Sequence, residues 1–141
     1  MRNHCLIFAA IAFTTNCTLA ADFYHVLSVR YEGGLVKNFL GGPYNGKAGC
    51  EKNAQAVWDN VITTCGSCTK EVIGCMESSA FPDLYKKTFR NEIIPNPYVA
   101  ATQKGRIVYS GVGHATAFRE CQHTATQFRT SGFPQAVCIS P

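Results

Sequence analysis

The chain has 141 residues, eight cysteines and a formal net charge of +4. Its basic residues are scattered, and the densest group, Lys86, Lys87 and Arg90, is much shorter than the basic stripe of a nucleic-acid-binding protein. Composition and charge therefore argue against a nucleic-acid partner. The group itself is typical of a solvated helix face.

The first 20 residues are predicted to be a secretory signal peptide. A short basic start that contains Arg2 precedes an apolar run over residues 5–13, and Thr18 and Ala20 supply small residues before a cleavage site. The run is well short of the roughly 20 apolar residues that span a bilayer. We therefore expect an exported chain, periplasmic or secreted, without a membrane span in its mature part. Residues 21–141 have the size of a single domain.

The first half of the mature chain, about residues 22–76, predicts two strands, a helix and a third strand. Paired glycines at 33–34 indicate a hairpin turn between the two strands. Glycines 41 and 42 with Pro43 are expected to end the second strand and lead into the helix. The helix has one apolar stripe, which includes Cys50, Ala54 and Val61. We expect strands at 23–31, 35–40 and 71–76, and a helix at 45–62.

The second half, about residues 98–141, repeats this order after a connector at 77–97. Pro82 and Asp83 begin a short predicted helix in the connector, and Pro95 and Pro97 then favour extended backbone. Glycine and proline at 132 and 134 stop the last helix. We expect strands at 98–102, 106–110 and 135–139, and helices at 82–90 and 116–130.

An offset of 71 residues aligns the two halves across the helix, and an offset of 63 aligns their last strands. The alignment predicts an α+β domain made of two tandem β-β-α-β repeats, with a mostly antiparallel sheet and the helices packed on one face. The matched positions include Val36 with Ile107, Gly42 with Gly113, Cys50 with Cys121, and Cys75 with Cys138.

Six cysteines follow the signal peptide, and an even number in an exported chain predicts three disulfides. The repeat favours one symmetric set, in which each helix is tied to its own third strand. An alternative set keeps the link between the second long helix and its third strand and re-pairs the other four cysteines. The symmetric set is Cys50–Cys75, Cys121–Cys138 and Cys65–Cys68; the alternative is Cys50–Cys65, Cys68–Cys75 and Cys121–Cys138.

Two short motifs resemble the SPOR (sporulation-related repeat) family of bacterial envelope domains. They are Gly42-Pro43-Tyr44 before a helix that contains Ala48, and the stretch GFPQAV at 132–137 after a helix. The resemblance implies a sheet built from two strand–helix–strand halves, and binding to the glycan strands of peptidoglycan. The six cysteines, an additional strand in each half and the connector depart from the family pattern.

Cys65 and Cys68 have the spacing of a thiol–disulfide exchange site. They follow a helix, and the electronegative C-terminal end of a helix disfavours a thiolate. A structural disulfide is therefore favoured, and a thiol–disulfide oxidoreductase that uses this pair is the alternative function. The histidines and acidic residues are dispersed along the sequence. We therefore expect no other catalytic group, no metal site and no cofactor.

If the helices cover one face of the sheet, the other face carries alternate strand residues. Tyrosine, arginine and serine on such a face suit contact with a glycan or a protein. The candidate binding residues are Tyr24, Arg30 and Tyr98. The sequence thus predicts a small, exported, non-enzymatic binding protein, whose partner is a protein, as for an inhibitor or immunity factor, or peptidoglycan.

Overall fold

The computed structural model describes residues 21–141, and the predicted signal peptide at 1–20 lies outside the described residues. The described chain contains six strands, three α-helices and one short 3-10 helix, η1. In chain order these are β1 (Asp22–Arg30), η1 (Glu32–Gly34), β2 (Val36–Asn45), α1 (Lys47–Thr64), β3 (Thr69–Glu77), α2 (Asp83–Phe89), β4 (Tyr98–Ala100), β5 (Gly105–Ser110), α3 (His114–Thr130) and β6 (Val137–Ile139).

The six strands form one antiparallel sheet in the order β3-β1-β2-β5-β4-β6. The predicted α+β class is therefore confirmed. The pairing of β2 with β5 at the centre joins the two halves of the chain, with Phe39 opposite Ile107. Each half places its third strand, β3 or β6, at an edge of the sheet.

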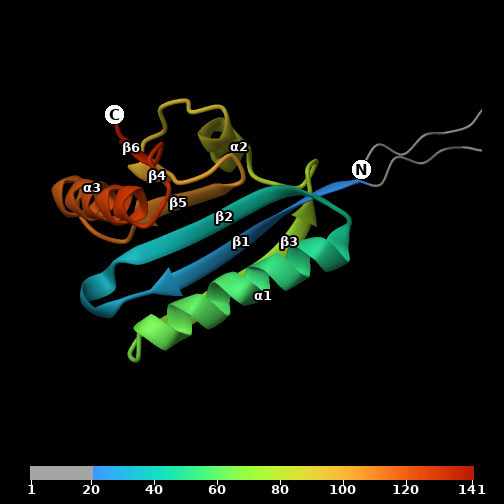
Figure 1. The fold of residues 1–141 in the computed structure, drawn as a ribbon, viewed down its shortest axis with the longest axis horizontal. Helices are drawn as coiled ribbons and strands as arrows, with labels where there is room; N and C mark the ends of the chain where they lie inside the picture. Colours follow the sequence, from blue (N-terminus) through green and yellow to red (C-terminus); the bar gives the residue numbers. More distant parts are fainter. Residues whose placement is uncertain (1–20) are drawn as a thin grey trace, which may run out of the picture.

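Helices α1 and α3 lie on the same face of the sheet, as predicted (Figure 1). Strand alternation points Leu27 and Val29 toward α1, where they pack against Val61. Ile107 and Val99 point toward α3 in the same way. Phe39 and Tyr31 pack against both of these clusters, so one continuous apolar layer underlies the two helices.

Three disulfides join the six cysteines in the symmetric set, and the alternative set is excluded. Cys50 on α1 is bonded to Cys75 on β3, with 6.0 Å between the Cα atoms. Cys121 on α3 is bonded to Cys138 on β6, with 5.5 Å between the Cα atoms. Each long helix is thus tied to an edge strand. The third disulfide, Cys65–Cys68, lies in the loop between α1 and β3.

The connector, with α2, packs against the other face of the sheet. Phe81 and Ile94 from the connector are 1% and 2% exposed, and they contact Val26, Leu40 and Tyr98 of the strands. The short helix predicted at 82–90 is confirmed as α2. The sequence did not predict that the connector as a whole forms part of the core.

The predicted turn at residues 41–43 is wrong, because β2 continues through it to Asn45 and α1 begins only at Lys47. Gly41 and Gly42 are needed inside the strand. A side chain at Gly41 would collide with the ring of His25, and Gly42 has a φ of +139°. The residue before α1 is Gly46, which has no side chain to cap the helix.

The gap-free offset of 71 does not hold in the strands. Val36 pairs with Ser110, on the face away from α1 and α3, whereas its proposed counterpart Ile107 packs beneath α3. An odd shift between equivalent strands exchanges the two faces of a sheet, because side chains alternate with a period of two. The internal repeat stays a prediction, and its alignment needs a shift between strand and helix.

Candidate functional site

A groove of about 550 Å³ lies between α1 and α3, above the strands β2 and β5. Phe39 and Ile107 form its apolar floor. The side chains that form its walls are Val57, Asn60, Val61 and Thr64 from α1, and Thr124, Gln127 and Phe128 from α3.

The groove exists because the two helices cover different parts of the sheet. Helix α1 contacts β1, β2 and β3, whereas α3 contacts β4, β5 and β6. The disulfides Cys50–Cys75 and Cys121–Cys138 tie the helices to the outermost strands. Six strands at about 4.8 Å spacing make a sheet about 24 Å wide, and two helices about 10 Å across can stand apart on it. The space over the central pair of strands therefore stays open.

The charged residues of the groove are all basic. Lys37, Lys104 and Arg106 are among its lining residues, and no Asp or Glu of the described chain is. The guanidinium of Arg106 is turned to the other face, where its Nε donates a hydrogen bond to the carbonyl oxygen of Thr88 at 2.8 Å. The two lysines are thus the cations available to a molecule in the groove.

Lys37 lies on β2 with its ammonium close to two aromatic rings. Its Nζ is 4.8 Å from the centre of the Tyr31 ring and 5.7 Å from that of Tyr109, distances typical of cation–π contacts. Burial lowers the pKa of Lys37, and the charge of Glu120 on α3 opposes this effect. No ion pair or hydrogen bond within residues 21–141 involves the Lys37 ammonium. A half-buried cation of this kind is suited to an anionic ligand group.

The other end of the groove contains His25, Tyr44 and Lys104. His25 is 2% exposed, and its ring stacks on Tyr44 at 5.7 Å between ring centres. Burial lowers the pKa of His25 to about 4, so the ring is neutral near pH 7. Lys104 Nζ lies 5.9 Å from the centre of the Tyr44 ring. This end therefore offers one exposed cation beside an aromatic surface.

The candidate binding residues from the sequence lie on the face opposite the groove, and they do not form one exposed surface. Tyr98 is fully buried, and its hydroxyl donates a hydrogen bond to the carbonyl oxygen of Glu92 at 2.8 Å. Tyr24 stacks on Phe81 with 4.6 Å between ring centres. The connector thus covers both tyrosines, and Arg30 alone of the three is exposed.

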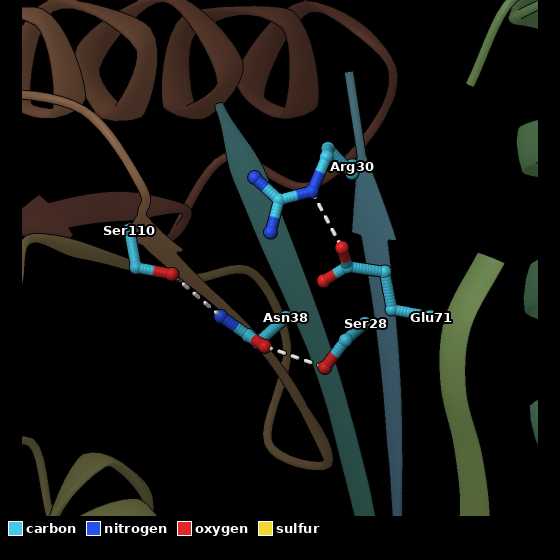
Figure 2. Close-up of polar contacts among 5 residues, drawn as sticks. All are labelled: Ser28, Arg30, Asn38, Glu71 and Ser110. Carbon is cyan, nitrogen blue, oxygen red and sulfur yellow. Dashed lines mark hydrogen bonds and ion pairs between the residues drawn. The ribbon is translucent and has the colours of Figure 1, made fainter. Parts of the chain in front are cut away.

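Arg30 lies beside a row of polar residues that crosses β1, β2 and β5 (Figure 2). Ser28 donates a hydrogen bond to Asn38 Oδ1 at 2.6 Å, and Asn38 Nδ2 donates to Ser110 Oγ at 3.2 Å. Arg30 Nε lies 2.5 Å from Glu71 Oε1. Because these groups satisfy one another, the row strengthens the sheet and presents few free donors or acceptors.

Cys65 and Cys68 lie outside the groove lining. Cys65 directly follows α1, and its backbone N–H donates to the carbonyl oxygen of Val61 at 3.0 Å. Both cysteines are half-buried, and Cys68 packs against the apolar cluster beneath α1. The pair sits at the C-terminal end of the helix, as the sequence predicted.

Sequence reasoning missed the groove lysines. The signal was a lysine among the alternating residues Leu35, Lys37 and Phe39, where the two neighbours on the same face are apolar. A cation that faces a helix-covered core is uncommon unless it has a partner. Lys104 lies in a turn and carries no such signal.

No family model, no curated protein and no solved structure matches the chain. Within residues 21–141, no helix has the length and apolar character to cross a membrane. In the same part of the chain, no three His, Cys, Asp or Glu side chains come together as possible metal ligands.

Proposed function

We propose that the chain is a small, exported, non-enzymatic binding protein of the periplasm or extracellular space, and that it contacts a protein partner through the groove between α1 and α3. The groove itself carries the proposal. It is an open space of about 550 Å³ with an apolar floor, and its walls are two helices that disulfides tie to the sheet. Three disulfides fit an oxidising compartment.

The lining of the groove suits a polypeptide better than a glycan chain. Phe39, Ile107, Val57 and Phe128 present apolar surface, which sugar hydroxyls would cover without hydrogen bonds. Interface cores of proteins combine apolar and aromatic side chains with a few polar groups at the rim. Asn60 and Gln127 supply such a rim on the two opposite walls.

The titratable groups of the groove also favour binding over catalysis. General acid–base catalysis needs an acid and a base that converge on one reacting group. The charged residues that line the groove are basic, and none of the described Asp or Glu residues lines it. The histidine of the groove is buried and stacks on Tyr44. An inhibitor or immunity protein needs a binding surface and no catalytic group, and the disulfide-tied helices supply the walls of such a surface.

Site-specific photo-crosslinking in the organism that encodes the chain tests this function. A photoreactive phenylalanine analogue in place of Gln127 puts the crosslinking group on the groove wall. The same analogue in place of Gln122, which is exposed on α3 outside the groove lining, is the matched control. We expect a discrete adduct from Gln127 that protease removes, and none from Gln122. An adduct that only a muramidase removes would assign the groove to cell-wall glycan instead. Equal yields at both positions would reject the groove as the contact surface.

A further inference from the structure

We propose that the groove binds an extended acidic segment of the partner, with one carboxylate at Lys37 and a second at Lys104. This inference rests on the proposed function, and it specifies the chemistry of the segment that enters the groove. The occupant is a stretch of polypeptide with the pattern acidic–x–apolar–x–acidic.

Charge complementarity is the first argument. Lys37 and Lys104 are basic lining residues whose ammonium groups form no ion pair within residues 21–141, although the charge of Glu120 on α3 acts on Lys37. A carboxylate beside the half-buried Lys37 ammonium would be less screened by solvent than one on an open surface. It would also replace water lost from the ammonium when the groove is filled. An acidic ligand would therefore give Lys37 a direct ion pair, whereas a neutral ligand would leave the ammonium with only its ring contacts and the charge of Glu120.

The spacing of the two cations gives the second argument. Lys37 lies four residues before Gly41 on β2, and Gly41 pairs with Gly105, the neighbour of Lys104. Four strand residues span about 13 Å. In an extended segment, residues i and i+4 are separated by the same distance and point to the same side. Two acids at this spacing match the separation of Lys37 from the Gly41–Gly105 pair beside Lys104, and the residue between them would face the floor at Phe39 and Ile107.

The rims of the groove supply the third argument. Asn60 on α1 and Gln127 on α3 are exposed, and their side-chain amides make no hydrogen bond within residues 21–141. A side-chain amide both donates and accepts hydrogen bonds, as a peptide group does. The two amides can therefore satisfy the backbone of a segment that runs along the groove.

Titration of the purified, disulfide-bonded mature protein with synthetic peptides tests the inference. The probe is a blocked nine-residue serine peptide with aspartate at its third and seventh positions and phenylalanine at its fifth. One control peptide has asparagine in place of both aspartates, and another has the second aspartate at the sixth position. We expect the probe to shift the amide resonances of Phe39, Ile107 and Phe128 and to bind at least tenfold more tightly than either control. Its affinity should fall severalfold between 50 and 300 mM salt, since ionic screening weakens such contacts.

Variants of the protein then assign the effect to the lysines. Lys37→Met should weaken the probe at least tenfold and Lys104→Met severalfold, whereas Lys52→Met, an exposed position of α1 outside the groove lining, should leave it within twofold. Equal affinity for the acidic and the asparagine peptide, or no binding of the acidic peptide, would overturn the inference. The proposed function would survive that result if the Gln127 adduct with a protein persists. Absence of a protein adduct at Gln127 would reject both this inference and the proposed function.

Discussion

The two faces of the sheet are covered in different ways. On one face, two long helices are tied to the edge strands and leave a groove over the centre. On the other, a segment of about twenty residues lies directly on the strands and fills the space with aromatic rings. Phe81 and Tyr98 are 1% and 0% exposed there. Helices held apart leave a cavity, whereas an irregular segment can follow the surface beneath it.

This difference explains why the expected binding face is not a free surface. A strand residue that points away from the long helices was expected to meet solvent, yet Tyr24 and Tyr98 meet the connector. The groove face, expected to be closed core, contains the unpaired Lys37. The face predicted to bind is thus covered by the connector, and the face beneath the long helices contains the open groove. The experiments below test each face, beginning with the largest expected effect.

Phe81→Ala tests whether the connector belongs to the core. The ring is 1% exposed, stacks on Tyr24 at 4.6 Å and lies 6.1 Å from the ring of Phe89. Truncation of a buried phenylalanine leaves a cavity and costs about 3–5 kcal/mol of unfolding free energy. Urea denaturation of oxidised protein measures the loss. Ile93→Ala is the matched control in the same segment, since Ile93 is 66% exposed, and it should cost less than about 0.5 kcal/mol. Similar small losses for both variants would show that the connector is a loose cover.

Much of this fold was predictable, and the failures have physical causes. Helical and strand periodicity located the long elements, because an amphipathic pattern depends only on which face is buried. The disulfides followed from pairing each helix with its own strand. The connector has no such period, so its docking depends on tertiary contacts of Phe81 and Ile94 that no local pattern encodes. The sequence pattern of Gly41 and Gly42 is typical of a turn. In the structure both glycines lie inside β2, where their backbone comes close to the side chains of His25 and Tyr24 on β1.

Removal of single disulfides tests whether the groove depends on its tethered walls. Cys50 and Cys75 are 25 residues apart in sequence, and Cys65 and Cys68 are 3 apart. On the chain-entropy model, the first link stabilises by about 3.5 kcal/mol and the second by about 2 kcal/mol. We expect Cys50→Ala with Cys75→Ala to lose the larger amount and to raise amide exchange throughout α1. A loss no greater than that of Cys65→Ala with Cys68→Ala would contradict the role of the tether.

The same cysteines separate the structural and the redox interpretation of the loop. If Cys65–Cys68 is structural, it should resist mild reductant in the folded protein, and rapid alkylation of Cys65 after such treatment would support a thiol–disulfide oxidoreductase. Quantitative alkylation with mass spectrometry measures this. Cys121–Cys138, a helix-to-strand link of separation 17, provides the internal reference in each sample.

Arg106→Met tests how the connector is fastened to its face. The side chain is 5% exposed, and its guanidinium donates to the carbonyl oxygens of Thr88 and Gly105, at 2.8 and 2.9 Å, and to Asn91 Oδ1 at 3.2 Å. Loss of these charge-assisted hydrogen bonds should cost about 2–3 kcal/mol. Limited proteolysis should also become faster within residues 82–97.

Two further variants test the Arg106 assignment. Arg106→Lys should recover only part of the stability, because one ammonium cannot reproduce the planar set of donors. Arg119→Met, an exposed arginine of α3, is the control, and it should change stability by less than about 0.5 kcal/mol. If Arg106→Met is no worse than this control, the connector is held by its aromatic contacts alone.

Acid titration probes the groove face through His25, and between pH 7.5 and 5.5 its expected effect on stability is the smallest of these. Burial lowers the pKa of His25 to about 4, whereas an unfolded histidine has its ordinary pKa of about 6.5. Below pH 6.5 the unfolded chain therefore binds a proton that the folded chain refuses, so stability falls as pH falls and the loss is complete below pH 4. Between pH 7.5 and 5.5 the protonation of this group should lower the free energy of unfolding by about 1.4 kcal/mol.

The variant His25→Gln should flatten that part of the pH profile, and His123→Gln, at an exposed position on α3, should not. If His25→Gln is poorly folded, NMR titration of the His25 ring in the wild-type protein gives the same answer. A ring that titrates near pH 6.5 would mean that this end of the groove is open to water, and His25 would then join Lys37 and Lys104 as a group that a ligand can reach.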